Sequence, residues 1–322
     1  MALLLGTRRG LDATSSARGT FAVLALDHRQ NLRKELHPED PSATTTDEMI
    51  EFKRTVVRSL SSIATGTLLD PEIGAAQCIA DGSLAGRDGL IVALEATGYE
   101  GDAAARVSRL LPGWDVTKAK RMGASAAKVL VYYHPDAPNV ADQERFVAGL
   151  AADCRANDVA LFVEPLSFGL DGSPLTGEDR RRVVIETARR LTALGGDVLK
   201  AEFPYDAAVE DRSRWADACT ELDAASVLPW VLLSGGVDDA TFEAQVEVAC
   251  EAGASGVLVG RSVWAPAAAL APEARTPWLQ AEGTARLRRL VDLVESAGHP
   301  WRPRWIDAVH PEPPEPGWYA RY

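Results

Sequence analysis

Short apolar runs alternate with amphipathic segments along most of the chain. The runs predict buried strands at residues 21–27, 63–70, 90–95, 126–133, 159–166, 198–204, 230–236 and 256–260. Apolar residues at helical spacing predict helices at residues 47–61, 141–156, 178–194, 212–224, 240–252 and 284–296. Strands that alternate with helices are typical of parallel strands joined by helical crossovers. The pattern therefore predicts an α/β fold with eight βα units.

The polar residues of these strands distinguish a closed barrel from an open sheet. Six lie at or near the C-terminal ends of different strands: Asp27, Asp70, Glu95, Glu164, Lys200 and Arg261. Lys128 lies nearer the middle of its strand. A (β/α)8 barrel builds its active site from the C-terminal ends of many strands, whereas an open sheet gathers it near one switch point. We therefore expect a single-domain (β/α)8 TIM barrel.

Two segments lie outside the alternation. Residues 96–123, broken by several glycines and a proline, form a long excursion after the third strand that is suited to covering the barrel mouth. Residues 299–322 contain six prolines and three tryptophans, too aromatic for a flexible linker. We expect a barrel of residues 1–298 and a C-terminal extension, residues 299–322, that packs on the barrel or on a neighbouring subunit of a homo-oligomer.

Composition narrows the classes of partner. Lys and Arg total 34 against 46 Asp and Glu, and the formal charge of −12 argues against nucleic-acid or membrane partners. The four cysteines are far apart, which favours reduced thiols in a cytoplasmic protein. The apolar run at residues 2–5 is too short for a signal peptide, and no stretch approaches the roughly 20 apolar residues of a membrane span.

Two lysines interrupt apolar strands and indicate amine chemistry. Lys200 lies in the run at 198–204 and Lys128 in the run at 126–133. Burial disfavours the charged form of a lysine, and two neighbouring cations each favour the neutral form of the other, which makes a nucleophile. The alternative is a strand-end lysine that reaches solvent or pairs with Glu202, since side chains two apart on a strand share a face.

Two carboxylates are candidates for proton transfer and orientation. Glu164 precedes a proline that stops its strand, so it fits a general acid or base, or a structural partner of Lys128. Asp27 begins a polar cluster with His28 and Arg29, where it fits either a helix cap or a residue that orients a hydroxyl or the amine.

Two glycine turns predict an anion site. Ser234, Gly235 and Gly236 end the seventh strand, and Gly260 and Arg261 end the eighth. Glycines let backbone N–H groups approach an anion, Arg261 adds a fork of donors, and phosphate sites recur after these two strands of the barrel. The five histidines and four cysteines show no paired ligand spacing, so neither a metal site nor a cofactor is expected.

These residues, in this order, resemble the class I aldolases that include tagatose-bisphosphate aldolase and sulfofructose-phosphate aldolase. The resemblance runs from about residue 21 to residue 264. The segments that carry it are Leu-Asp-His-Arg at 26–29, Ala-Lys-Val-Leu at 127–130, Val-Glu-Pro at 163–165, Val-Leu-Lys-Ala-Glu at 198–202, the run at 230–236, and Ala-Gly-Ala-Ser-Gly-Val-Leu-Val-Gly-Arg-Ser-Val-Trp at 252–264.

The resemblance implies that Lys200 forms an imine with a ketose phosphate, without a cofactor, and releases dihydroxyacetone phosphate and an aldehyde. It implies that Lys128, Glu164 and Asp27 are active-site residues. Substrate or phosphate contacts would come from His28, Arg29, Glu202, Ser234, Gly235, Gly236, Gly260 and Arg261. His28 stands where the family usually has glutamine. The substrate expected is a tagatose 1,6-bisphosphate-like ketose or 6-deoxy-6-sulfofructose 1-phosphate.

Two other functions remain open on the sequence. One is a sugar-phosphate sensor that binds without turnover, and the other is a different sugar-phosphate lyase or isomerase on the same barrel. Trapping of an imine separates them from an aldolase, because neither a sensor nor an enediol isomerase forms a covalent adduct.

Overall fold

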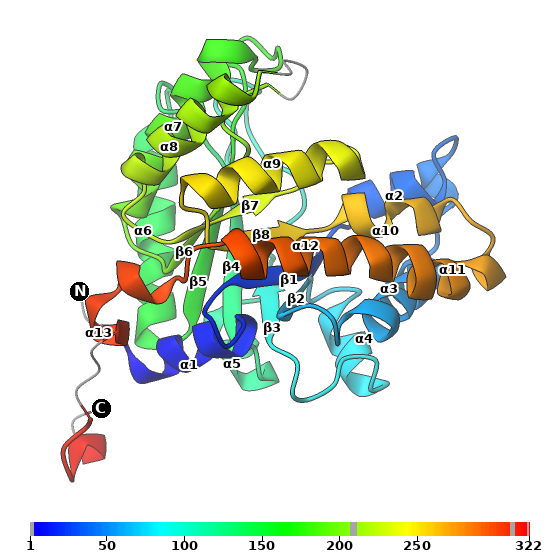
Figure 1. Cartoon of the computed structure of the whole chain (residues 1–322), viewed down its shortest axis with the longest axis horizontal. Coiled ribbons are helices and arrows are strands. Elements are labelled where there is room, and N and C mark those ends of the chain that lie inside the picture. Colours follow the sequence, from blue (N-terminus) through cyan, green and yellow to red (C-terminus); the bar gives the residue numbers. More distant parts are fainter. Residues whose placement is uncertain (1–2, 207–210, 310–312, 321) are drawn as a thin grey trace.

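Eight parallel strands close into a barrel in chain order, with β1 paired to both β2 and β8 (Figure 1). The computed structural model describes residues 3–206, 211–309, 313–320 and 322. The strands are β1 Phe21–Leu26, β2 Gly66–Leu69, β3 Leu90–Ala93, β4 Ala126–Tyr132, β5 Ala160–Leu166, β6 Val198–Ala201, β7 Trp230–Leu233 and β8 Gly256–Val259. The predicted (β/α)8 TIM barrel is confirmed.

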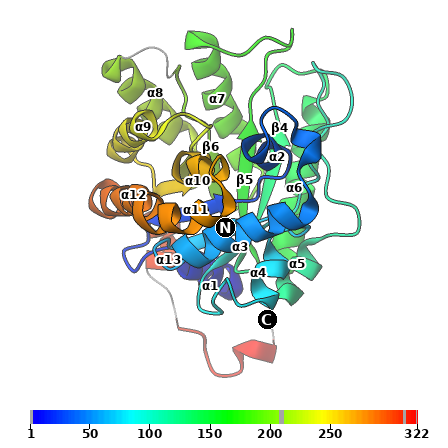
Figure 2. The same cartoon turned by 90° about the vertical axis from the view of Figure 1, so that its right-hand side faces the viewer.

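Helices pack around the outside of the barrel (Figure 2). Those that follow the predicted periodicity are α3 Thr46–Leu60, α6 Val140–Ala156, α7 Gly177–Thr192, α8 Arg212–Ala225, α9 Asp239–Ala252 and α12 Thr284–Ala297. The others are α1 Leu5–Thr14, α2 Gln30–Leu36, α4 Ala75–Ala80, α5 Val116–Met122, α10 Arg261–Ala268, α11 Pro272–Trp278 and α13 Ile306–Val309. Short 3-10 turns lie at Pro41–Ala43, Arg302–Arg304 and Trp318–Ala320, and a π turn at Leu279–Gly283.

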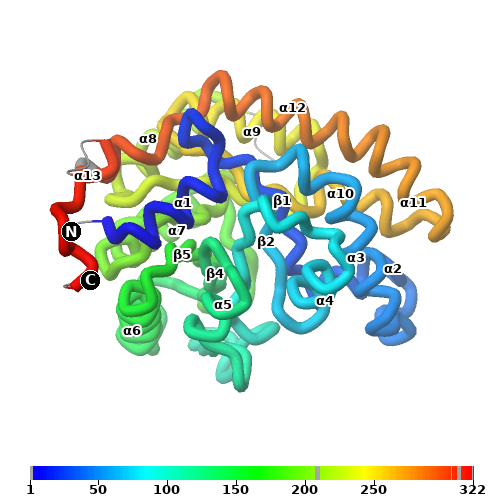
Figure 3. The backbone as a smooth tube through the Cα atoms, turned by 90° about the horizontal axis from the view of Figure 1, so that it is seen from below, coloured from blue at the N-terminus to red at the C-terminus, as the bar shows by residue number. Residues whose placement is uncertain are grey.

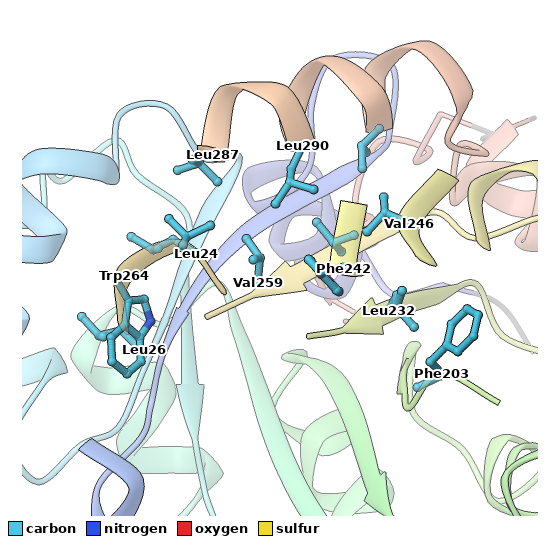
Figure 4. Packing of buried hydrophobic residues seen from close by; sticks show 14 of the residues in the cluster. Leu24, Leu26, Phe203, Leu232, Phe242, Val246, Val259, Trp264, Leu287 and Leu290 are labelled. Atoms are coloured by element: carbon cyan, nitrogen blue, oxygen red, sulfur yellow. The ribbon is translucent and has the colours of Figure 1, made fainter. Parts of the chain in front are cut away.

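Alternation along the strands divides the core into two layers. In β1, Leu24 and Leu26 face outward and pack with helix residues such as Leu290 of α12 and Phe242 of α9 (Figure 4). Phe21, Val23 and Ala25 belong to a second cluster formed by alternate residues of the other strands. Because successive side chains point to opposite faces of a strand, this second cluster fills the barrel interior.

The N-terminal end of the barrel is closed by α1 and by the segment after α12, which lie together when the molecule is viewed from below (Figure 3). Leu11 and Trp301 are fully buried and join the interior cluster. The backbone N–H of Trp301 donates to the Gly19 carbonyl at 2.9 Å, and its indole Nε1 donates to Ser15 Oγ at 3.1 Å. The sequence pattern does not predict α1, because its apolar positions are few.

Residues 299–309 of the expected C-terminal extension contact this end of the barrel, where Arg302 pairs with Asp12 at 2.6 Å. Residues 310–312 and 321 of that extension lie outside the described residues. Its separation from a barrel of residues 1–298 stays a prediction, as does any packing on a neighbouring subunit. Within the described ranges, none of the helices combines the length and apolar character needed to cross a membrane.

Asp197, just before β6, makes the stability of this end depend on pH. Its side chain accepts the Leu161 N–H at 2.8 Å, and burial raises the pKa of its carboxyl to about 6. A raised pKa means that the folded state binds a proton that the unfolded state releases, so this contribution to stability is present at low pH and is lost as the pH rises through 6.

We expect Asp197→Asn, which keeps the acceptor for Leu161, to remove this dependence. The difference in unfolding free energy between variant and wild type should grow by about 1 kcal/mol in favour of the variant from pH 5 to pH 7. Urea unfolding at both pH values measures it. A difference that stays constant would show that Asp197 is ionised throughout.

Candidate active site

A cavity of about 440 Å³ opens at the C-terminal ends of the strands. It is lined by most of the residues singled out from the sequence: Asp27, His28, Arg29, Glu164, Lys200, Glu202, Ser234, Gly235, Gly260 and Arg261. Lys128 lies beneath the cavity, where it contacts Glu164. Gly236 is outside the lining but lies against Arg261, which is part of it. The structure thus brings together residues that are spread over more than 230 positions of sequence.

Strand alternation explains why the charged side chains point into the barrel. Val198 of β6 and Phe162 of β5 pack in the interior cluster. Lys200 and Glu164 come two residues later on the same strands and therefore face the same way. Lys128 follows Ala126 of β4 by the same rule. The interior changes from apolar to charged at the level where the cavity begins.

Lys128 lies at the centre of three carboxylates. Its Nζ is 2.6 Å from Asp27 Oδ2, 2.7 Å from Glu95 Oε1 and 2.7 Å from Glu164 Oε2. Burial alone would lower the pKa of Lys128, but the three carboxylates raise it well above its ordinary value. Lys128 is therefore a permanent cation whose charge is offset by its own neighbours.

Glu164 bridges the two lysines. Its Oε1 is 2.6 Å from Lys200 Nζ, and its Oε2 contacts Lys128. The alternative for Lys200, solvent exposure or pairing with Glu202, is wrong, because its side chain is only 6% exposed and its carboxylate partner is Glu164. Glu202 instead accepts hydrogen bonds from the backbone and hydroxyl of Ser167, at 2.7 and 2.6 Å. A carboxylate at 2.6 Å from the buried amine can exchange a proton with it directly.

Asp27 and His28 line the β1 side of the cavity in different charge states. Burial would raise the pKa of Asp27, but Lys128 and Lys200 hold it well below the ordinary value, so Asp27 stays ionised. Burial, together with Arg261 and against the opposing effect of Asp27, lowers the pKa of His28 to about 3. His28 is therefore a neutral imidazole, and its buried Nδ1 has no hydrogen-bond partner among the described residues.

Glu95 is a member of the charged cluster that the sequence did not assign to the site. Its Oε2 accepts the Leu130 N–H at 3.0 Å, and its carbonyl accepts from Arg29 at 2.8 Å. Arg29, expected to contact substrate, also pairs with Glu72 at 2.5 Å. One signal in the sequence points to Glu95. It lies at the C-terminal end of the third predicted strand, just as Asp27 and Glu164 lie at the ends of the first and fifth.

The turns after β7 and β8 form a polar wall opposite β4. Gly236 has a φ of +85°, and a Cβ there would lie 2.7 Å from a guanidinium nitrogen of Arg261, so glycine makes room for this arginine. The Nε of Arg261 is buried without a hydrogen-bond partner, and its nearest described carboxylate, Glu35, is 3.9 Å away. A half-buried guanidinium whose carboxylate contact is no closer than 3.9 Å, beside two glycine turns, is suited to binding an oxyanion.

Comparison with known proteins supports an aldolase. Residues 21–266 match the model of the family described as DeoC/LacD family aldolase. The chain is 30% identical over 326 residues to tagatose 1,6-diphosphate aldolase 2 of Enterococcus faecalis, covering 94% of this chain and 97% of the relative. It is 29% identical over 325 residues to the tagatose 1,6-diphosphate aldolase of Lactococcus lactis, covering 94% and 99%.

Solved structures share the fold. An archaeal fructose 1,6-bisphosphate aldolase matches with a TM-score of 0.59 at 22% identity, over 90% of this chain and 99% of that one. A fructose-bisphosphate aldolase from Slackia heliotrinireducens matches with a TM-score of 0.63 at 14% identity, over 92% and 94%. At these identities the likeness supports the barrel architecture and leaves the substrate open.

Proposed function

The chain belongs to the DeoC/LacD family of aldolases, and on that premise we propose that it is a class I aldolase that cleaves a phosphorylated ketose through an imine on Lys200. The observation that carries the proposal is the contact of 2.6 Å between the buried amine of Lys200 and the carboxylate of Glu164, in a cavity that also contains Arg261. An amine, a proton acceptor and an anion site in one cavity are the parts that this chemistry needs.

The proposed reaction begins when Lys200 gives its proton to Glu164 and its neutral amine attacks the ketone carbon. The carbinolamine takes a proton on its oxygen and loses water, which gives an iminium. A base removes the proton of the hydroxyl at C4, the C3–C4 bond breaks, and its electrons enter the iminium to form an enamine. The aldehyde leaves. Protonation of the enamine and hydrolysis then release dihydroxyacetone phosphate and the free amine.

Glu164 is the proposed proton carrier of this sequence, because it contacts both lysines and lines the cavity. Ionised Asp27 is the proposed acceptor for a substrate hydroxyl, with the neutral His28 beside it. The contacts favour a different role for Lys128 from the one expected on the sequence. We assign it as a positioning residue that holds Asp27, Glu95 and Glu164 in place, since three carboxylates offset its charge.

Reduction with borohydride in the presence of dihydroxyacetone phosphate tests the proposal directly. We expect a stable adduct on the peptide that contains Lys200, identified by mass spectrometry, and no adduct without the ketone. An adduct on another lysine would contradict the assignment. Complete absence of an adduct, with the ligand still bound, would favour the sensor, or an isomerase if the ligand is interconverted.

The substrate proposed is a ketose 1-phosphate with a second anionic group, either tagatose 1,6-bisphosphate or 6-deoxy-6-sulfofructose 1-phosphate. The named relatives support the first of these. His28, where the family usually has glutamine, supports no choice by itself, because its low pKa makes it as uncharged as glutamine. Cleavage rates on the two substrates, measured side by side, discriminate between them.

The wall formed by Gly236 and Arg261 gives a prediction about phosphate binding. Gly236→Ala places a methyl group against the Arg261 guanidinium and strains a φ of +85°. We expect KM for the ketose phosphate to rise about 10-fold or more, with a smaller change in kcat, because a charge-assisted contact to the phosphate is displaced. Steady-state kinetics measure both.

Gly113→Ala is the matched control. Its φ of +77° is strained in the same way, but a Cβ there meets nothing within 4 Å and the residue lies outside the cavity lining. We expect the control to lose stability without a comparable rise in KM. Equal KM values for the two variants would mean that the wall does not act through Arg261.

A further inference from the structure

Arg106 lies in a hairpin of the excursion between β3 and β4. Thr97 and Gly98 at the start of this excursion line the central cavity, and Arg106 lies just outside that lining, in contact with Tyr132 of the cavity wall. Backbone hydrogen bonds between Glu100 and Val107, at 3.0 and 2.8 Å, close the hairpin. The side chain of Asn139 donates to the Arg106 carbonyl at 2.9 Å and ties the hairpin to the start of α6. The backbone position of Arg106 is therefore fixed without a ligand.

Three aromatic rings from three different segments hold its guanidinium. The central carbon lies 4.4 Å from the ring centre of Phe168, 4.6 Å from that of Tyr99 and 5.6 Å from that of Tyr132. Tyr132, at the end of β4, also lines the central cavity. Aromatic faces stabilise a guanidinium but leave the N–H groups at its edge free to donate.

The charge of Arg106 is not offset by an acid. Within 4 Å of it the structure places no carboxylate of a described residue, and its only side-chain hydrogen bond to them is from Nε to the Ala103 carbonyl at 3.2 Å. Three other arginines differ: Arg29 pairs with Glu72, Arg109 of the same hairpin with Glu100 at 3.0 Å, and Arg180 with Glu202 at 3.5 Å. Its terminal amino groups are therefore available to an oxyanion.

The barrel places Arg106 and Arg261 on opposite sides of the mouth. Strand order is sequential, so β4, which carries Tyr132, is four strands from β8, which precedes Arg261. Lys200 on β6 lies two strands from each.

We propose that Arg106 is a specificity-determining residue that binds a second tetrahedral oxyanion, at the end of the substrate remote from the phosphate held by Arg261. This inference rests on the proposed function and deepens it, because it assigns the residue that recognises the second anionic group of the proposed ketose 1-phosphate. The planar fork of Arg106 donates two hydrogen bonds to either group.

The test compares kcat/KM for a ketohexose 1,6-bisphosphate, the corresponding 6-sulfonate 1-phosphate, and the 1-phosphate with an uncharged far end. Arg106→Met is expected to lower the value about 30-fold or more for a far-end anion that the subsite accepts, and less than about threefold for the uncharged substrate. One of the two charged substrates should be cleaved faster by wild type and should also lose kcat/KM selectively in Arg106→Met. Its far-end group is the one that the subsite accepts. Equal losses on all three substrates would overturn the proposal, since they would indicate that Arg106 merely supports Tyr132.

Three further variants sharpen the result. Arg109→Met removes a hairpin arginine that already has a carboxylate partner and is expected to change no substrate more than about threefold. Arg106→Lys keeps the positive charge but loses the planar guanidinium, so we expect a selective loss of kcat/KM that is intermediate between wild type and Arg106→Met. If the methionine variant does not fold, this lysine variant provides the test. A selective loss in Arg29→Met but not in Arg106→Met would assign the subsite to Arg29 and overturn the proposal.

Failure of this inference is distinguishable from failure of the proposed function. Borohydride trapping with dihydroxyacetone phosphate needs no far-end anion, so Arg106→Met is expected to form the Lys200 adduct as wild type does. If Arg106→Met forms the adduct but shows no selective loss of kcat/KM, the aldolase function stands and the assignment of the subsite to Arg106 is wrong. A missing adduct in wild type overturns the proposed function on which the subsite depends.

Discussion

Lys200→Met is expected to lower ketose cleavage by about 10⁴-fold or more, the largest effect of any single substitution in this site. Methionine keeps an unbranched apolar stem of similar length in the buried position, but it has no amine to form the iminium. Without that electron sink, the C3–C4 bond has no low-energy route to break. Cleavage is measured by coupling the released dihydroxyacetone phosphate to its reduction, and adduct formation by mass spectrometry.

Two controls separate loss of the nucleophile from loss of structure. Lys200→Arg keeps a cation near Glu164, but the guanidinium stays protonated and has no free amine to attack a ketone. We therefore expect this variant to be as inactive as Lys200→Met and to form no adduct. Glu202→Gln changes the next cavity-facing residue of the same segment, which bonds to Ser167 instead of Lys200, and should still form the adduct. Residual cleavage above about 1% in Lys200→Met would place the imine elsewhere.

The strand pattern was enough to predict the barrel and the level of the site within it. Alternation on β6 and β5 decides that Lys200 and Glu164 face the interior, and the strand ends decide that they face one cavity. Both properties follow from local sequence, because a parallel strand buried on two sides is a continuous apolar run in which a charge is conspicuous.

Pairing within the site was not predictable from the same pattern. Glu202 has the spacing to face Lys200, yet its carboxylate accepts hydrogen bonds from Ser167 in the loop after β5, while Glu164 contacts the amine from β5 itself. Arg106 was equally hidden, because its three aromatic partners come from separate segments. Such contacts depend on the stagger between strands and on loop paths, which local sequence does not encode.

The N-terminus of α7 illustrates a similar limit at a helix end. Thr176, with Asp179 three residues later, has the residue types of a helix N-terminus, but its side chain makes no capping hydrogen bond. Asp238 before α9 does cap, accepting the Thr241 N–H at 3.0 Å. The two sequences look alike as caps, and the rotamer that decides between them depends on the loop that precedes each helix.

Lys128→Met is expected to destabilise the fold by about 3–5 kcal/mol at pH 8, because it leaves three buried carboxylates without their central cation. Asp27, Glu95 and Glu164 would then repel one another, and among the described residues Lys200 and Arg29 are the cations that still contact this cluster. Denaturant unfolding measures the loss. Lys118→Met, at an exposed lysine of α5, is the control and should change the free energy of unfolding by less than about 0.5 kcal/mol.

The pH dependence and a second substitution identify the cause of that loss. Without Lys128, Asp27 loses the largest of the effects that hold the pKa of its carboxyl below the ordinary value, so that pKa rises and the folded protein takes up a proton that the unfolded chain releases. The deficit should therefore be largest at pH 8 and shrink towards pH 5. Glu95→Gln, added to Lys128→Met, removes one of the repelling charges and should recover about 1–2 kcal/mol at pH 8. A deficit that is the same at both pH values and is unchanged by Glu95→Gln would mean that Lys128 contributes packing of its stem, and that the carboxylates do not need its charge to stay together.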